Sequence, residues 1–285
     1  MEKHAFIIMA HNNFRILNVL LELLDYTKND IYLHIDKKST IPKDLYEPQK
    51  SNLYMSPQRF DVRWGSFSQI ELEIYLFNEA YNKGPYKYYH LLSGVDLPIK
   101  DNEYIHNWFN NNYPKEFVGF LPCNDIKEQL FRVQNFHFFT NNLKDSGSIY
   151  TRIHWKLIAL QINYKIKRNR GIDFMKGANW VSITNNCVKY LIENKKFIYK
   201  IYKFSFCADE IFLQTLLWNS DLKNNIYNIN DEYKGCMRKI CWKRGSPYIW
   251  RINDYDELIS SPYIFARKFD EKEINIVNKI YSYLH

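Results

Sequence analysis

The sequence predicts an α/β fold built on a parallel sheet. Two observations lead to this prediction: strand-like and helix-like segments alternate through the first third of the chain, and Phe6 to Met9 form a continuous apolar run, as in a strand buried on both faces. The 285 residues, 46% of them hydrophobic, are enough for a large core without disulfides or structural metals. No repeat, low-complexity tract or linker interrupts them, so we expect a single domain.

The elements of the first third follow from residue spacing. Leucines recur at helical intervals between Phe14 and Leu24, and Ser68 with Glu71 fits a capping box at the start of a helix. In chain order, we expect a strand at Phe6 to Met9, a helix at Phe14 to Leu24, a strand at Ile31 to Ile35, a helix at Ser68 to Tyr81 and a strand at Tyr88 to Leu92.

The pattern after residue 100 is less regular. Thr184 is placed to cap a helix across Val188 to Ile192, and Asp209 with Glu210 opens another helix. The remaining expected elements are strands at Phe117 to Leu121, Trp180 to Ile183 and Met237 to Trp242, and helices at Ile149 to Lys167, from Asp254, and at Glu271 to Leu284.

Targeting and redox signals are weak. The apolar run from Ala5 to Ala10 is too short for a secretion signal or a membrane span. Five cysteines form no Cys-x-x-Cys pair, which favours reduced, buried thiols over a disulfide framework or a zinc site. We therefore expect a cytoplasmic protein.

The formal net charge of +8 favours anionic partners, although the compositional bias of an AT-rich genome explains it equally well. A nucleic-acid-binding protein is one rival interpretation. It lacks support because the sequence has no aromatic RNA-binding block and no basic helix suited to a groove, and salt-dependent binding of random oligonucleotides would favour it.

Phosphate-binding signatures are missing: there is no P-loop and no Gly-x-Gly-x-x-Gly. If this fold handles a nucleotide, a metal or basic side chains must hold the diphosphate. Ligands bind at the carboxyl ends of strands in open α/β sheets, where Asp36 and Asp96 are placed, although turn or capping roles suit them equally well.

Seven sequence blocks occur in the order typical of one family. They are FIIMAH at 6–11, IYLHIDKKS at 31–39, RWGSFS at 63–68, YYHLLSGVDLPIK at 88–100, GANWVSI at 177–183, CADE at 207–210 and IFARKFD at 264–270. In these blocks the chain resembles the core-2/I-branching N-acetylglucosaminyltransferases, a family that also contains peptide O-xylosyltransferases and many bacterial members.

The resemblance implies a glycosyltransferase-A type fold, a Rossmann-like mixed sheet flanked by helices. It also implies inverting transfer of a sugar from a UDP-sugar substrate to a hydroxyl of a glycan acceptor, with no cofactor and no metal. N-acetylglucosamine is the first choice of sugar, and xylose or another sugar is the alternative. Residues 1–120 would mainly bind the nucleotide, and residues 121–285 would bind the acceptor and carry catalysis. A lipid-linked saccharide acceptor would bring the basic surface into peripheral contact with the inner membrane face.

The family's site residues map onto particular positions. Glu210 ends the CADE block and would be the general base, although Cys207 and Ala208 replace the Ser-Pro common in relatives. Lys268 would face the diphosphate together with an upstream arginine. The remaining donor contacts expected are His11, Asp36 (at the uracil or ribose), Asp96, and Arg244 or Arg251 as that arginine.

Contacts to the sugars are expected from aromatic and charged side chains. Phe136, Phe138 and Phe139 lie in an aromatic stretch that fits sugar stacking or core packing. The sugar or acceptor residues expected are Trp64, Glu128, Arg132, Trp180 and Asp209, with a surface ion pair as the alternative for Glu128 and Arg132.

Asp254-Tyr255-Asp256 matches the metal-binding Asp-x-Asp pattern of sugar transferases. We interpret it instead as the N-cap of a helix, because so short a pattern arises by chance. A second rival to the transferase is a non-catalytic glycan-binding relative, which would bind UDP and acceptor without turnover.

Overall fold

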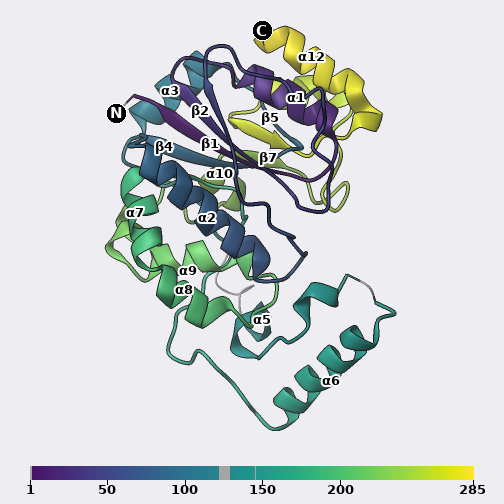
Figure 1. Cartoon of the computed structure of the whole chain (residues 1–285). Helices are drawn as coiled ribbons and strands as arrows, with labels where there is room; N and C mark the ends of the chain where they lie inside the picture. Colours follow the sequence, from purple (N-terminus) through teal and green to yellow (C-terminus); the bar gives the residue numbers. More distant parts are fainter. Residues whose placement is uncertain (1, 122–128, 145) are drawn as a thin grey trace.

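A computed structural model describes residues 2–121, 129–144 and 146–285. Its centre is a five-stranded sheet in the order β3-β2-β1-β4-β6 (Figure 1). The strands are β1 (His4–Ala10), β2 (Asn29–Ile35), β3 (Asn52–Met55), β4 (Tyr88–Ser93) and β6 (Ser182–Thr184). The first four run parallel and β6 runs antiparallel to β4, so the sheet is mixed.

A second, smaller sheet adjoins it, with β8 (Phe265–Arg267) between β5 (Asp96–Pro98) and β7 (Arg238–Ile240). The α-helices described are α1 (Phe14–Leu23), α2 (Ser68–Lys83), α3 (Asn102–Asn111), α5 (Phe131–Gln134), α6 (Ile149–Asn163), α7 (Asn185–Glu193), α8 (Lys195–Tyr202), α9 (Phe212–Trp218), α10 (Glu232–Cys236), α11 (Tyr255–Ile259) and α12 (Ile274–Leu284).

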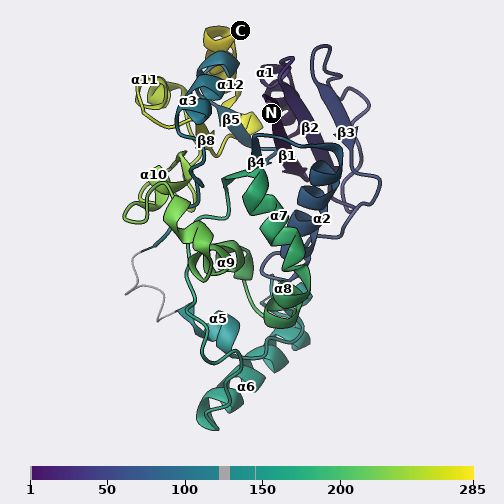
Figure 2. The ribbon, with the colours of Figure 1, turned by 90° about the vertical axis from the view of Figure 1, so that its left-hand side faces the viewer.

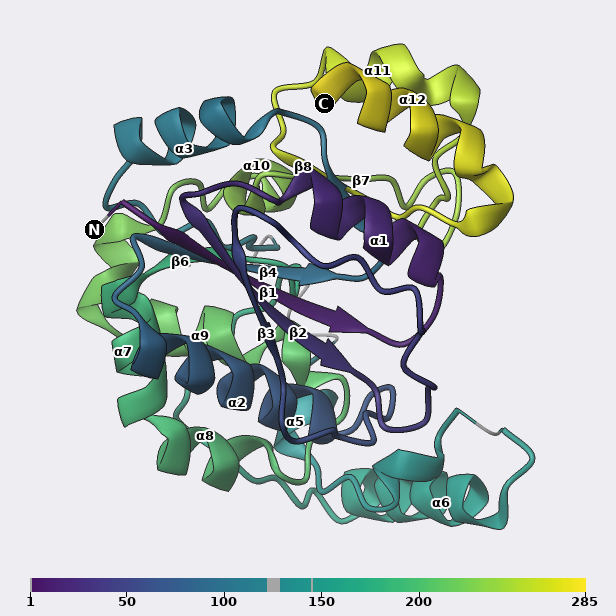
Figure 3. The ribbon, with the colours of Figure 1, turned by 45° about the horizontal axis from the view of Figure 1, so that its top comes forward.

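Alternating side chains of β1 belong to two cores. Ala5 and Ile7 pack into a cluster that holds the apolar faces of α2, α7 and α9, whereas Phe6 and Ile8 pack against α1, α3 and α12. Figure 3 shows these two groups of helices on opposite sides of the central sheet. The buried strands therefore read as continuous apolar runs, which explains why the sequence predicted them well.

The α6 helix lies at the end of the molecule remote from α3 and α12 in all three ribbon views (Figures 1, 2 and 3). Within the described residues, no helix combines the length and the apolar character needed to cross a membrane.

Histidines fill part of the core. The ring of His4 stacks on that of His106 at 4.0 Å, and His4 Nδ1 lies 3.0 Å from His90 Nε2. Burial lowers the pKa of His106 to about 4 and lowers the pKa values of His4 and His90 well below 6.5. His34, whose Nε2 accepts the Phe60 N–H at 2.9 Å, likewise has its pKa lowered to about 4, mainly by burial.

The structure corrects several sequence-based boundaries. The helix at Ser68 has Phe67 as its N-cap without a side-chain hydrogen bond, so the expected capping box is wrong; Ser68 Oγ instead accepts the Arg63 N–H. The expected helix at 149–167 ends at Asn163, because Lys165 adopts the left-handed conformation (φ 54°).

Other differences lie in short segments. Phe117 forms only a single bridge to Ser182 instead of a strand at 117–121. The expected strand at 180–183 starts at Ser182, and the strand at 237–242 is limited to Arg238–Ile240. Asp209 and Glu210 lie in a 3₁₀ turn before α9, and Thr184 caps α7 as predicted, accepting the Cys187 N–H. Among the described strands and α-helices, those not predicted are β3, β5, β8, α3, α5, α8 and α10.

Candidate active site

The candidate site lies where the central strands end. The parallel strands β1, β2 and β4 lead directly to His11, Asp36 and the turn before Asp96, at one edge of the sheet. In an open α/β sheet this is the edge where ligands bind. An open hollow of about 540 Å³ adjoins His11, and α1 residues Phe14 and Arg15 line it with Ser39.

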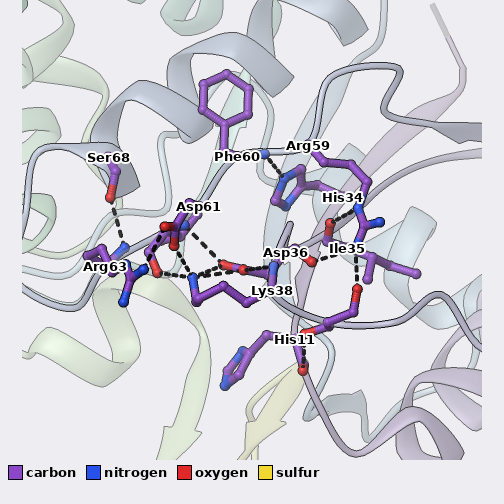
Figure 4. Close-up of polar contacts among 12 residues, drawn as sticks. His11, His34, Ile35, Asp36, Lys38, Arg59, Phe60, Asp61, Arg63 and Ser68 are labelled. Atoms are coloured by element: carbon purple, nitrogen blue, oxygen red, sulfur yellow. Dashed lines mark hydrogen bonds and ion pairs between the residues drawn. The ribbon is translucent and has the colours of Figure 1, made fainter. Parts of the chain in front are cut away.

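Asp36 is surrounded by donors from its own chain (Figure 4). Its carboxylate accepts backbone N–H groups of Lys38 at 2.9 Å and of Val62 at 3.0 Å, and Lys38 Nζ lies 2.8 Å away. Burial opposes ionisation, but these hydrogen bonds outweigh it and lower the pKa of Asp36. The carboxylate therefore fixes the loop 59–63 beside the strand ends.

The same loop is tied down by charged side chains (Figure 4). Lys38 Nζ also contacts Asp61, which binds Arg63 at 2.7 Å, and Arg59 donates to the carbonyl oxygens of Asp36 and Ser39. The loop leads directly to Trp64, so these contacts also help to position Trp64.

Asp96 is buried and holds an arginine. Its carboxylate accepts the backbone N–H and the hydroxyl of Ser93, both at 2.8 Å, and lies 3.0 Å from Arg267 Nη1. The Arg267 guanidinium in turn lies 4.2 Å from the centre of the Trp180 ring. A ligand in this region would therefore meet Arg267 and Trp180 before Asp96, which is 1% exposed.

Lys268 directly follows β8 and is half-buried. Its backbone pairs with residues 248–250: the Lys268 N–H donates to Tyr248 and its carbonyl accepts the Trp250 N–H. Among the residues that the structure describes, no carboxylate pairs with the Lys268 ammonium group.

The two candidate arginines differ in their partners. Arg244 is held at 2.8 Å by both Asp254 and Glu257 and packs over the Tyr248 ring. Arg251 follows Trp250, is exposed, and lies 3.6 Å from Glu273. Both arginines border the segment that pairs with Lys268.

Glu210 is one-third exposed and lies between two cations. Its Oε2 atom is 2.9 Å from Arg132 Nη1 and 3.2 Å from Lys176 Nζ, both from largely buried side chains. Within the described residues, its Oε1 atom has no recorded partner. The Glu210 carbonyl accepts the Gly177 N–H at 2.9 Å, which ties this turn to the 176–180 segment.

Gly177 permits this approach because two backbones cross there. A Cβ atom at position 177 would lie 1.8 Å from the carbonyl oxygen of Gly119. The 176–180 segment then continues to Trp180, under Arg267. A continuous series of contacts thus leads from Glu210 to the neighbour of Lys268.

Two further carboxyl groups lie behind Glu210. One belongs to Asp209. Burial of the Asp209 carboxyl group and the negative charge of Glu210 raise the pKa of Asp209 to about 7. Glu73, on α2, accepts a 2.8 Å hydrogen bond from Asn179, and burial followed by the charge of Asp209 raises the pKa of Glu73 well above its ordinary value.

Trp64 stands beside this turn with 58% of its surface exposed. Its ring meets that of Phe206 edge to face at 5.5 Å, and the next residue, Gly65, accepts the Cys207 N–H. Cys207 itself is buried in the left-handed conformation (φ 44°). Residue 207 therefore forms a tight bend directly before the acidic pair.

The Asp-x-Asp segment has an internal role. Asp254 begins α11 as expected, but its side chain accepts the preceding Arg251 N–H and pairs with Arg244, so it does not cap the following turn as an N-cap side chain would. Across 2–121, 129–144 and 146–285, no cluster of three His, Cys, Asp or Glu suits a metal ion.

Glu128 lies outside the described residues, so its predicted pairing with Arg132 stays a prediction, and so does the state of Cys123. The other four cysteines are free thiols, and all except Cys241 are buried.

Sequence reasoning missed Lys176, Arg267 and Glu73. Lys176 directly precedes the GANW block, and Arg267 lies inside the FARKF block beside Lys268, so their positions offered a signal. Glu73 gave none, because a glutamate within an amphipathic helix is ordinarily solvated.

A model of the Core-2/I-Branching enzyme family matches residues 4–256. No curated protein sequence matches the chain significantly. Among solved structures, the crystal structure of mouse xyloside xylosyltransferase 1 in its apo form is similar, with 11% sequence identity, a TM-score of 0.40, and coverage of 93% of this chain and 97% of that one.

The family match over nearly the whole chain defines the protein as a glycosyltransferase. It belongs to the Core-2/I-Branching enzyme family. The predicted fold class, a mixed Rossmann-like sheet flanked by helices of the glycosyltransferase-A type, is confirmed by the sheet order and this membership.

Proposed function

We propose that this enzyme transfers a sugar, with N-acetylglucosamine as first choice, from a UDP-sugar to a hydroxyl of a glycan, with inversion at the anomeric carbon and without a metal ion. The acceptor we favour is a lipid-linked saccharide at the cytoplasmic membrane face. The observation that carries the proposal is the Glu210 carboxylate, with one oxygen neutralised by Arg132 and Lys176 and the other left for a ligand.

The proposed reaction is a single displacement. The acceptor oxygen bonds to the anomeric carbon as the bond from that carbon to the β-phosphate oxygen of UDP breaks. The acceptor proton passes to Glu210. General-base assistance of this kind accelerates a reaction by roughly 10² to 10⁴.

The departing UDP gains negative charge, which fixed cations can stabilise. Lys268 suits this role because its ammonium group has no carboxylate partner among the described residues. We choose Arg251 over Arg244 as its companion, since Asp254 and Glu257 both hold Arg244 at 2.8 Å, whereas Arg251 is more exposed and lies 3.6 Å from Glu273. On this proposal Asp36 and His11 border the nucleoside, and Asp96 acts by holding Arg267.

The sugars would lie between the strand ends and the 207–210 turn. Trp64 offers an exposed ring, packed against Phe206 next to the 207–210 turn, for the acceptor, and Trp180, under Arg267, borders the donor side. In this arrangement residues 1–120 supply most nucleotide contacts and residues 121–285 supply the base and the diphosphate cations.

A thermal-shift panel of UDP-sugars with and without EDTA tests donor and metal together. One UDP-sugar is expected to raise the unfolding temperature equally in both conditions, because a ligand that binds only the folded state stabilises it. Incubation of that donor with glycan acceptors should then release UDP and yield a product of inverted anomeric configuration. Stabilisation lost on chelation would contradict the metal-independent mechanism, and binding without turnover would favour a glycan-binding relative.

A further inference from the structure

The α6 helix places three polar side chains inward. Thr151, His154 and Gln161 are buried together with Ile158. The Gln161 amide bonds to both backbone groups of Phe136, at 2.7 and 2.9 Å, and His154 Nδ1 lies 2.6 Å from the Phe138 carbonyl oxygen. These hydrogen bonds hold α6 to the 136–139 segment.

The outward surface of α6 carries exposed apolar side chains beside the basic Arg152 and Lys156. Ile149 is 60% exposed, Ile153 37% and Leu160 51%. Spacings of four and seven residues place these three side chains on one side of the helix. An ordinary surface helix has the opposite arrangement, with its apolar stripe against the core. Several exposed apolar side chains gathered on one side of a helix mark an interaction site.

The apolar exposure continues past the end of the helix. Tyr164 is 71% exposed and Ile166 47%, and Trp155 exposes 45% of its surface on another side of α6. Aromatic rings together with branched aliphatic side chains are typical of helices that lie in a membrane interface.

The charge of this region selects the partner. Residues 146–172 contain no Asp or Glu, but they contain six basic residues: Arg152, Lys156, Lys165, Lys167, Arg168 and Arg170. A second copy of the chain meeting this face symmetrically would bring like charges together. Anionic lipid headgroups instead complement them. The exposed basic side chains can reach headgroups while their stems stay apolar, whereas Arg168 is held by the carbonyl groups of Lys200 and Ile201.

We propose that α6 and residues 164–170 form a membrane-docking surface that lies in the headgroup region of a bilayer containing anionic phospholipid. The outward apolar side chains would enter the acyl boundary and the basic residues would contact phosphates. This inference rests on the proposed function for its purpose, which is to bring the site to a lipid-linked acceptor. Trp155 meets Phe206 edge to face at 6.3 Å, so the docking surface adjoins the turn that carries Glu210.

Vesicle co-sedimentation tests the proposal. The full chain is expected to bind vesicles of phosphatidylcholine mixed with phosphatidylglycerol, to bind phosphatidylcholine alone far less, and to dissociate in high salt. The double variant Ile153→Ser/Leu160→Ser should bind mixed vesicles about tenfold more weakly, because it removes apolar area from the docking surface. Arg152→Gln/Lys156→Gln should weaken the binding and its salt dependence.

The matched control is Ile229→Ser/Tyr283→Ser, which removes two apolar side chains of similar exposure, 45% and 58%, elsewhere on the molecule. It should bind vesicles like the wild type. All variants should unfold at the wild-type temperature, since the changed side chains are exposed.

Three results would overturn the proposal: no binding of the wild type to mixed vesicles, equal binding by Ile153→Ser/Leu160→Ser, or a wild-type dimer in analytical ultracentrifugation that this variant converts to monomer. Vesicle binding is measured without donor, and sugar transfer is measured with a short water-soluble acceptor. Loss of one readout without the other therefore separates failure of docking from failure of the proposed transferase activity.

Discussion

The Arg267 guanidinium lies 3.0 Å from the buried carboxylate of Asp96, and this ion pair joins β8 to its neighbour β5. Asp96 is 1% exposed, so its charge has no alternative solvation. The ion pair positions Arg267 over the Trp180 ring. It thereby fixes the position of the backbone at the next residue, Lys268.

Asp96→Asn should destabilise the protein by about 3–5 kcal/mol, because it leaves Arg267 buried without a counterion. Urea unfolding followed by fluorescence measures the loss. Asp173→Asn, at an exposed carboxylate, is the control and should change the free energy of unfolding little. Similar stabilities for the two variants would show that the ion pair has no structural role.

Glu210→Gln should lower kcat by roughly 10² to 10⁴ while donor binding changes little, since a base acts on the acceptor proton and an amide cannot remove it. UDP release under saturating donor measures kcat. Glu193→Gln, an exposed glutamate on α7, is the matched control. Normal turnover by Glu210→Gln would remove the assignment of the base.

Lys268→Ala should weaken UDP-sugar binding and lower kcat together, because the charge of the diphosphate is present in the ground state and grows in the transition state. Isothermal titration with UDP and steady-state kinetics measure the two effects. Lys272→Ala removes an exposed lysine four residues further on and should leave both unchanged. If UDP affinity and rate survive in Lys268→Ala, other cations hold the diphosphate.

Trp64→Ala should raise the KM for the acceptor about three- to tenfold, the effect of losing one aromatic packing contact. The KM for the donor and the unfolding temperature should stay the same, since Trp64 is 58% exposed. Trp242→Ala, with 53% exposure, is the control. An unchanged acceptor KM would place the acceptor away from this ring.

Stability should fall as the pH falls from about 6.5 towards 4. In this window the unfolded chain takes up protons on histidines that the folded protein keeps neutral. A histidine whose pKa drops to about 4, as burial causes for His34 and His106, contributes on the order of 3 kcal/mol to this loss.

Urea unfolding across this range measures the slope of stability against pH. His106→Gln should reduce that slope, because glutamine does not titrate and its amide can still bond to Asn29, whose oxygen lies 2.7 Å from the histidine. His285→Gln, at the chain end, should not change it. The same slope in His106→Gln and the wild type would contradict the origin of the effect.

The sequence was sufficient for the elements that form the central core. Runs such as Phe6 to Met9 are buried on both faces, and the leucines of α1 all face one core, so periodicity alone located them. β3 and β5 were missed because each is short and lies at the edge of its sheet. Their formation depends on pairing with distant strands, which local sequence does not encode.

The site was partly predictable for a related reason. Strand order brings Asp36, Asp96 and His11 to one edge, so their positions followed from the fold class. The partners of Glu210 could not be predicted in this way, because Arg132 and Lys176 are far from it in sequence and meet it only through tertiary packing. The sequence also did not reveal that polar side chains of α6 face the core, because the spacing of residues in a helix does not show which side is buried.

The crossing of Gly177 over Gly119 has a practical consequence for engineering. Because a methyl group at position 177 would collide with the Gly119 backbone, any larger residue there would displace Lys176, which precedes it, from its 3.2 Å contact with Glu210. Attempts to widen this enzyme's substrate range should vary the rings and loops around that crossing and leave the two glycines untouched.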